Sequence, residues 1–260
     1  MDTVILILVD GMRPDGLQQA TTPVLDRLIA EGSWTLQAKT VFPSISLPCI
    51  ASLILGTPPT VHGITTNTWT YASPTPGIMD VVKANGLRAA SFFNWEPLRD
   101  LSRPGALHIS LFLDNDEVPK GRGDTELVEL TAELLRREPV DFAFVYLGHT
   151  DAAGHTHGWM SEPYLRAIEN ADACIGTILQ ALEDREVGVI VTADHGGHDT
   201  HHGSDSPEDM TIPIVLYHPN LTTHGEMQGP VSILDIAPTV IQWMGLTTPE
   251  EWQGRALGQS

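Results

Sequence analysis

The sequence has few of the basic residues that would tie a protein to nucleic acid or to a membrane. It contains 14 lysines and arginines against 33 aspartates and glutamates, so its formal charge is −19. Binding to a nucleic-acid duplex or to a membrane surface needs basic stripes, and we expect neither here. The same charge repels anionic substrates at long range. Bound metal ions would be a compact local source of positive charge.

Cysteines and long apolar runs are also scarce. Cys49 and Cys174 are far apart in the chain and match no disulfide or zinc-ribbon spacing, which favours buried free thiols in a reducing compartment. The apolar run over residues 4–9 is too short to span a bilayer, and no basic segment precedes it. We therefore expect a buried strand there and a cytoplasmic protein.

Short apolar runs alternate with helical patterns along the chain. Runs typical of buried parallel strands cover residues 4–9, 88–93, 142–147, 187–191 and 212–217. Helix start and stop signals predict a helix over 21–32, apolar residues at three- and four-residue spacing predict helices over 124–138 and 164–184, and a last helix is expected over 232–245. This order predicts an α/β fold with a doubly wound, mostly parallel sheet and helices on both faces, in one compact domain over residues 1–260. Segment 94–123 has little periodicity and is either a loop-rich lid or a small insertion.

An aspartate follows each of three predicted strands. Asp10 comes directly after the run 4–9, Asp151 follows the run 142–147, and Asp194 follows the run 187–191. Ligands of open parallel sheets bind beyond the carboxyl ends of the strands, so we expect the three carboxylates to converge on one crevice. For any single aspartate, a helix cap or a turn explains the position equally well.

Histidines accompany two of these aspartates. His155 stands four residues after Asp151, so the two side chains could share one face of a helical turn. His195 follows Asp194 directly, and His202 lies in the same His-rich segment. Carboxylate and imidazole ligands suit Zn²⁺, with Mn²⁺ as an alternative, whereas this number of imidazoles argues against Ca²⁺. His198 and His201 are expected not to bind a metal but to support the ligands from behind or to lie on a polar surface loop. His149 and His157 could contact a substrate, and a polar surface loop explains them equally well.

Ser46 is the expected nucleophile. It begins an apolar helical run that ends at Gly56, and a helix N-terminus favours negative charge. Coordination to a metal would lower the pKa of its hydroxyl. An ordinary helix cap is the alternative role for Ser46, and Ser44 is a nearby competitor as nucleophile.

The ordered motifs resemble the alkaline phosphatase superfamily, and within it the type I phosphodiesterase/nucleotide pyrophosphatase group. They are VDG at 9–11, GTPPTVHGI at 56–64, DAAGH at 151–155, ADHGG at 193–197 and HGSDSPEDM at 202–210. The resemblance extends from residue 4 to about residue 217. It departs from the group at Leu47-Pro48, where the group carries an aromatic residue before proline.

The resemblance implies two divalent metal ions, Zn²⁺ or alternatively Mn²⁺, held by two ligand sets. One set is Asp151, His155 and His202, and the other is Asp10, Asp194 and His195. Ser46 would be the nucleophile in contact with the metals. Asn67 would contact a non-bridging phosphate oxygen, with a buried turn asparagine as the alternative.

The hypothesis is therefore a metal-dependent phosphodiesterase or nucleotide pyrophosphatase that acts on a small phosphate ester through a phosphoseryl intermediate. Few basic residues lie near the motifs, with Arg13 the nearest, which favours diesters over monoesters. Trp69, Trp95 and Phe93 could stack on a nucleobase, although core packing explains them better.

The alternative functions are a phosphomonoesterase, a phosphonate hydrolase, a sulfate ester hydrolase and a catalytically inactive zinc-binding protein. Sulfatase activity is discounted because Ile50 stands where sulfatases carry arginine. Phosphoglycerate mutases need a large inserted domain, for which the interval between Ser46 and Asp151 is too short.

Overall fold

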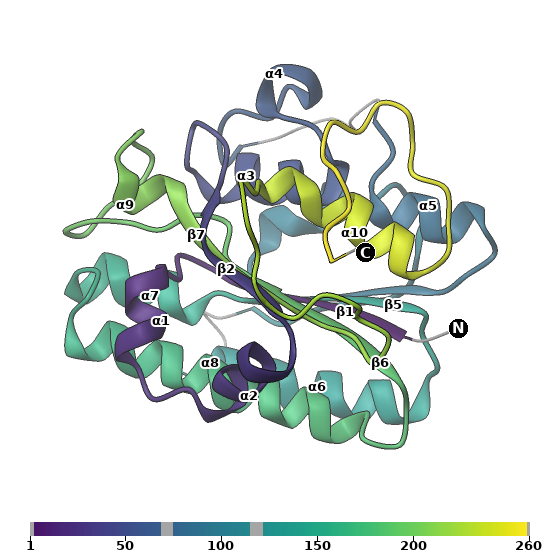
Figure 1. The fold of residues 1–260 in the computed structure, drawn as a ribbon, viewed down its shortest axis with the longest axis horizontal. Coiled ribbons are helices and arrows are strands. Elements are labelled where there is room, and N and C mark those ends of the chain that lie inside the picture. Colours follow the sequence, from purple (N-terminus) through teal and green to yellow (C-terminus); the bar gives the residue numbers. More distant parts are fainter. Residues whose placement is uncertain (1–2, 69–74, 115–121, 259–260) are drawn as a thin grey trace.

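The computed structural model describes residues 3–68, 75–114 and 122–258, and within them eight strands form one sheet (Figure 1). The strand order is β4-β3-β5-β1-β6-β7-β2-β8. The strands are β1 Thr3–Val9, β2 Ser33–Lys39, β3 Ala89–Phe93, β4 Leu107–Phe112, β5 Phe142–Leu147, β6 Val187–Thr192, β7 Thr211–Tyr217 and β8 Gly225–Glu226. The α/β fold with a mostly parallel sheet is confirmed.

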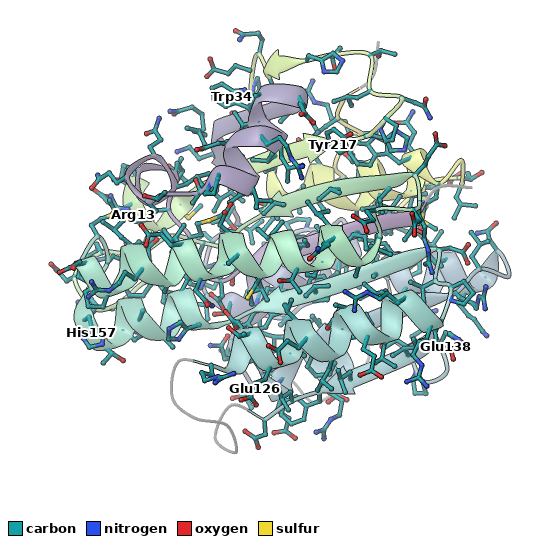
Figure 2. All side chains as sticks on the ribbon, turned by 90° about the horizontal axis from the view of Figure 1, so that it is seen from below. Arg13, Trp34, Glu126, Glu138, His157 and Tyr217 are labelled. Atoms are coloured by element: carbon teal, nitrogen blue, oxygen red, sulfur yellow. The ribbon has the colours of Figure 1, made fainter. Side chains whose placement is uncertain are left out.

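Helices cover both faces of this sheet (Figure 1). One face carries α3 Ser46–Leu55, α5 Ile78–Ala84 and α10 Ile236–Trp243. The other carries α1 Pro14–Gln19, α2 Pro23–Glu31, α6 Gly123–Arg137, α7 His149–His157 and α8 Glu162–Ala181, and Figure 2 is seen from this side. Within the described residues, four short elements complete the fold: α4 Pro59–His62, η1 Glu96–Leu101, α9 Pro207–Met210 and η3 Ile233–Asp235.

The centre of the sheet is apolar and parallel. Every residue of β1 is buried, and β1 pairs in parallel with β5 on one side and β6 on the other. Val9 of β1 lies opposite Leu147 of β5, and Leu8 lies opposite Thr192 of β6. Because the three strands end at the same level, the residues that follow them meet at one rim.

Three strands lack the continuous apolar run by which the others were predicted. In β2, buried positions are interrupted by half-buried and exposed ones, and β4 alternates between half-buried and exposed residues. The strand β8 has only two residues. One expectation was wrong, because the run 212–217 belongs to β7, which pairs antiparallel with both β6 and β2.

Segment 94–123 contains the short helix η1 and the edge strand β4 of the sheet, while its residues 115–121 lie outside the described residues. Both cysteines are buried free thiols, as expected. None of the helices in the described ranges is long and apolar enough to cross a membrane.

Candidate functional site

The three aspartates that follow the central strands lie together. Asp10 follows β1, Asp194 lies two residues beyond β6, and Asp151 is in the first turn of α7, which follows β5. The Nε2 atom of His195 is 3.3 Å from Asp10 Oδ1 and 3.4 Å from Asp194 Oδ2. Asp151 comes close to this group, since a side chain at Gly11 would touch its Cα at 3.2 Å. Residues almost two hundred positions apart in sequence thus form one acidic cluster.

Each aspartate in the cluster has a buried oxygen with no hydrogen-bond partner among the described residues: Oδ1 of Asp10, Oδ1 of Asp151 and Oδ2 of Asp194. The second oxygen of two of them is held in place. Tyr146 Oη donates to Asp10 Oδ2, and the N–H of Gly11 donates to Asp194 Oδ1 at 3.2 Å. Buried polar atoms nearly always have a partner, so these three oxygens are candidate ligand atoms for a cation.

The charge state of the cluster leads to the same conclusion. Burial raises the pKa of Asp10, Asp151 and Asp194, and repulsion from the neighbouring carboxylates raises the pKa of Asp10 further. Two buried carboxylates and the half-buried one of Asp151, this close together, cannot all ionise without positive charge beside them. A bound cation would supply that charge and return the pKa values toward their usual range.

Three histidines at the cluster use the same ring nitrogen, Nδ1, to bond to a backbone carbonyl. Nδ1 of His155 donates to the Thr200 carbonyl at 2.9 Å, Nδ1 of His195 to the Gly196 carbonyl at 2.7 Å, and Nδ1 of His202 to the Ser44 carbonyl at 2.8 Å. A carbonyl oxygen can only accept, so the proton lies on Nδ1 and Nε2 keeps its lone pair. Backbone carbonyls orient metal-binding histidines in the same way.

These Nε2 atoms face carboxylates. Nε2 of His202 is 3.7 Å from Asp151 Oδ1, and Nε2 of His155 is 3.5 Å from Asp151 Oδ2. Burial, and then the neighbouring His195, lowers the pKa of His202 to about 3, so this imidazole is neutral near pH 7. The neutral imidazole is the form that binds a metal ion.

Potential ligand atoms fall into two groups here, each within 4.8 Å. The first is Asp10, Asp194 and His195, the same set that the resemblance implies. The second is Asp151, His195 and His202, so His195 stands where His155 was expected. His155 still borders this group, because its ring centroid is 5.0 Å from that of His202.

Ser46 is the hydroxyl that faces the cluster. Its Oγ is 3.1 Å from His195 Nε2, and the residue is only 5% exposed. The N-cap of α3 is Ile45, so Ser46 does not serve as an ordinary helix cap. The competing hydroxyl of Ser44 donates instead to the Ser204 carbonyl at 2.6 Å.

Asn67 lies beside the start of helix α3, next to Ser46. Its Oδ1 accepts from the N–H of Leu47 at 3.0 Å, which leaves the Nδ2 hydrogens to point elsewhere. The same bond occupies a backbone donor of the helix start. Pro48 has no N–H, and the N–H of Cys49 donates to the Ile45 carbonyl at 3.0 Å. Helix α3 therefore offers a phosphate fewer backbone donors than its N-terminal position suggested.

Sequence reasoning missed Trp159, which joins the parts of the site. Its indole N–H donates to the Gly11 carbonyl at 2.9 Å, and its ring packs edge-on against His155, with centroids 5.2 Å apart. A Cβ at Gly154 or Gly197 would lie 2.7 or 2.3 Å from the ring, so both positions need glycine. The sequence contained one sign of this packing, because Gly154 and Gly197 stand in the motifs that carry His155 and His195.

Asp124 was also missed, because it lies far from every motif. It is fully buried, and its carboxylate accepts from Asn94 Nδ2 at 2.7 Å, the N–H of Gly148 at 3.0 Å and the N–H of His149 at 3.1 Å. The last two donors are backbone N–H groups at the start of α7, where the helix itself provides no acceptor. Asp124 thus caps, from another helix, the element that carries Asp151.

Of the aromatic and basic side chains considered for substrate contacts, those in the described residues pack or pair within the protein. Phe93 is buried and Trp95 stacks on Tyr146 with centroids 6.2 Å apart, so both pack in the core, while Trp69 lies outside the described residues. Arg13 donates through Nε and Nη2 to the two oxygens of Asp15 and through Nη1 to the Gly197 carbonyl. The guanidinium of Arg13 is therefore held by the protein itself.

The sequence model of the type I phosphodiesterase / nucleotide pyrophosphatase family matches residues 4–212. The chain belongs to this family. The matched range includes every residue of the site described above.

Individual relatives agree with this membership. Mouse ectonucleotide pyrophosphatase/phosphodiesterase family member 3 is 27% identical over 232 residues, covering 80% of the chain and 26% of the relative. A phosphopentomutase from Clostridium perfringens is 30% identical over 139 residues, covering 53% of the chain and 34% of the relative. The chain therefore spans about a third or less of the length of these relatives.

A solved structure shares the fold over nearly its whole length. Murine ectonucleotide pyrophosphatase/phosphodiesterase 5, in an inactive form complexed with AMP, superposes with a TM-score of 0.80 at 15% identity. The match covers 97% of the chain and 98% of that structure. The fold is therefore that of alkaline phosphatase-like enzymes.

Proposed function

We propose that the chain is a metal-dependent phosphoryl hydrolase that cleaves phosphodiesters or pyrophosphate-linked nucleotides through a phosphoseryl intermediate. The observation that carries the proposal is the position of Ser46 Oγ, 3.1 Å from His195 Nε2 at the edge of the buried aspartate cluster. Family membership supports the same reaction class. We also propose that the chain acts as one domain, since one sheet and its connections supply every residue of the site.

The residues fit two divalent cations. Asp10, Asp194 and His195 would hold one, and Asp151 and His202, with His155 at its border, would hold the other. Three buried oxygens without partners among the described residues, and three Nε2 lone pairs directed at carboxylates, support this assignment. Carboxylate and imidazole donors suit Zn²⁺ first and Mn²⁺ second. When bound, the cations supply positive charge that favours the serine alkoxide and neutralises phosphate oxygens.

Each residue of the site then has its own role in the reaction. Ser46 Oγ loses its proton and attacks phosphorus, a P–O bond to serine forms, and the ester bond opposite to it breaks as the leaving alcohol or phosphate departs with its electron pair and takes up a proton. Water then attacks the same phosphorus from the vacated side and loses a proton, and Ser46 Oγ leaves with its electron pair and regains a proton. Asn67 Nδ2 donates to a non-bridging oxygen, and its orientation is fixed by the N–H of Leu47 on Oδ1.

The surroundings favour a diester over a monoester. A monoester dianion needs an additional positive group beside the metals, and Arg13 was the nearest basic residue in the sequence. Because Asp15 and the Gly197 carbonyl occupy its guanidinium, Arg13 is a structural residue of the rim. A diester carries one negative charge less and makes a smaller demand on the site.

The test is Ser46→Ala, with Ser44→Ala as the matched serine control. Zinc-loaded Ser46→Ala should lose about 10³-fold or more in turnover of an aryl phosphodiester and form no phosphoenzyme, yet keep its bound zinc. Ser44→Ala should still form the phosphoenzyme. A phosphoenzyme on Ser46→Ala, or equal turnover by Ser46→Ala and wild type, would exclude Ser46 as the nucleophile.

A panel of aryl substrates separates the alternatives. The zinc- and manganese-loaded protein should hydrolyse the phosphodiester faster than the phosphomonoester, the phosphonate and the sulfate ester. A faster reaction with one of the other three would change the substrate class and keep the site. If no substrate reacts and the loaded protein binds less than about one equivalent of metal, the inactive binding protein is the correct interpretation.

A further inference from the structure

A second group of potential metal ligands lies outside the aspartate cluster. Single ligand atoms of His198, Asp199 and His201 lie within 4.8 Å of one another. They belong to the connection from β6 to β7, which extends beyond the strand ends and carries α9 (Figure 1). His198 is half-buried, and the other two are exposed. The catalytic assignment above uses none of the three.

A tight hairpin fixes the two imidazoles on one face. The N–H of His198 donates to the carbonyl of His201 at 2.9 Å, and the N–H of His201 donates back at 2.9 Å. Residues that exchange both bonds lie directly opposite each other and project to the same side. Their ring centroids are 5.5 Å apart. Asp199 in the turn has φ of 46°, a value that aspartate and asparagine tolerate better than most residues.

A buried carboxylate orients one of these imidazoles. Nδ1 of His198 donates to Asp209 Oδ1 at 2.7 Å, so Nε2 is available as a ligand. The other oxygen of Asp209 accepts from the N–H and the hydroxyl of Ser204 at 2.8 and 2.7 Å, and these two bonds fix the orientation of the carboxylate. A carboxylate behind a histidine is the usual support of a metal ligand.

The turn of this hairpin also contacts two residues beside the aspartate cluster, His155 and Trp159. The Thr200 carbonyl accepts from His155 Nδ1 at 2.9 Å, and the Asp199 carbonyl accepts from the N–H of Trp159 at 2.8 Å. The His155 side chain is 45% exposed, so packing alone does not fix its orientation. The backbone between the two hairpin imidazoles therefore determines where His155 Nε2 points.

We propose that His198, Asp199 and His201 bind a further divalent cation, of the zinc type, and that this cation holds the turn that orients His155. Two imidazoles and one carboxylate match the ligand preference of Zn²⁺, with water at the open position of an exposed site. Binding at the hairpin does not depend on the proposed function. The consequence for His155 does rest on it.

The test follows zinc binding to chelator-stripped protein by metal analysis and by the ¹H–¹⁵N spectra of the histidine rings. Wild type should bind about one equivalent more than His201→Ala, with shifts of the His198 and His201 ring signals. Asp199→Asn removes the ligand but suits the turn, and it should bind hairpin zinc about tenfold or more weakly. His108→Ala, which removes an exposed histidine from β4, should match wild type. If His201→Ala binds as much zinc as wild type and the two ring signals do not move, the site does not exist.

Asp151→Asn separates this proposal from the proposed function, because it alters the aspartate cluster and leaves the hairpin intact. It should still bind zinc at the hairpin. If wild type binds zinc at the hairpin but hydrolyses no phosphate ester, the proposed function is overturned and the hairpin site stands. If wild type hydrolyses a phosphate ester but binds no zinc at the hairpin, the hairpin site is overturned and the proposed function stands. Zinc affinity at the aspartate cluster should fall severalfold in His201→Ala, and an unchanged affinity would overturn the link to His155.

Discussion

At the scale of single residues, the site depends on partners that hold each ligand in one orientation. The acceptor of every imidazole Nδ1 at the cluster is a backbone carbonyl, and two of the three aspartates have one oxygen held by a donor. This arrangement leaves little for a cation to reorganise when it binds. It also makes the partners as important as the ligands themselves.

Tyr146→Phe tests such a partner. The hydroxyl of Tyr146 is the donor that holds Asp10 Oδ2, and its loss leaves that buried oxygen unpaired. Zinc affinity should fall about 10- to 100-fold. Tyr217→Phe, at a half-buried tyrosine at the end of β7, is the control and should keep the wild-type affinity. Equal zinc affinities of the two variants would show that Asp10 needs no such support.

His62 gives a pH dependence that is separate from the metal ligands. Its Nδ1 accepts from the N–H of Ile64 at 3.0 Å, and its Nε2 is 2.9 Å from Ser52 Oγ, which itself donates to the Pro48 carbonyl. Burial lowers the pKa of His62 to about 4 from an ordinary 6.5. A second ring proton would remove the bond from Ile64.

The unfolded chain therefore binds this proton more readily than the folded one, and the contribution of His62 to stability is present above pH 6.5 and lost as the pH falls toward 4. Wild type should lose about 2 kcal/mol of unfolding free energy over that range relative to His62→Gln. Urea unfolding at several pH values measures the difference. A difference that does not vary with pH would show that His62 does not titrate in this way.

At the scale of elements, α7 is the critical helix, because it carries both Asp151 and His155. Its own N-cap, Gly148, has no side chain, so the backbone donors at its start need a partner from elsewhere. Asp124 of α6 supplies that partner, and Trp159 fixes the opposite end against the loop after β6. Two neighbouring elements thus hold the helix in place.

Asp124→Asn removes one of the two accepting oxygens. It should cost about 1–3 kcal/mol of unfolding free energy, because a buried donor is left unpaired. Zinc binding should weaken as well, since the start of α7 is free to shift. Glu126→Gln, at a more exposed position of the same helix, is the control and should change neither quantity (Figure 2). Wild-type stability in Asp124→Asn would mean that α7 needs no cap from α6.

At the scale of the whole molecule, the charge of −19 acts against the proposed substrates. Long-range repulsion falls as salt screens it, with a Debye length of about 10 Å at 0.1 M. The kcat/KM for an anionic ester should rise with salt at low ionic strength, by about tenfold at most, and more steeply for a monoester dianion than for a diester. Rates that fall with salt would indicate that a local positive field at the site outweighs the net charge.

The sequence predicted more of the centre of this molecule than of its edges. The buried strands β1, β3, β5, β6 and β7 were visible as apolar runs because both faces of each are covered. The half-buried β2 and β4 were not visible, since their polar positions mask the pattern. The antiparallel direction of β7 was also hidden, because an apolar run has no direction.

The same division holds for the site. The sequence by itself determined the residue types and their places after the central strands, because the motifs are local and their spacing is fixed by the chain. Only the tertiary structure decided which atoms face the cluster and which residues hold them. Tyr146 and Trp159 act through hydrogen bonds across more than a hundred residues, and Asp124 bonds to another helix 24 and 25 residues away. Such contacts leave no local pattern in the sequence. The pairing of strands β1, β5 and β6 brings those segments together.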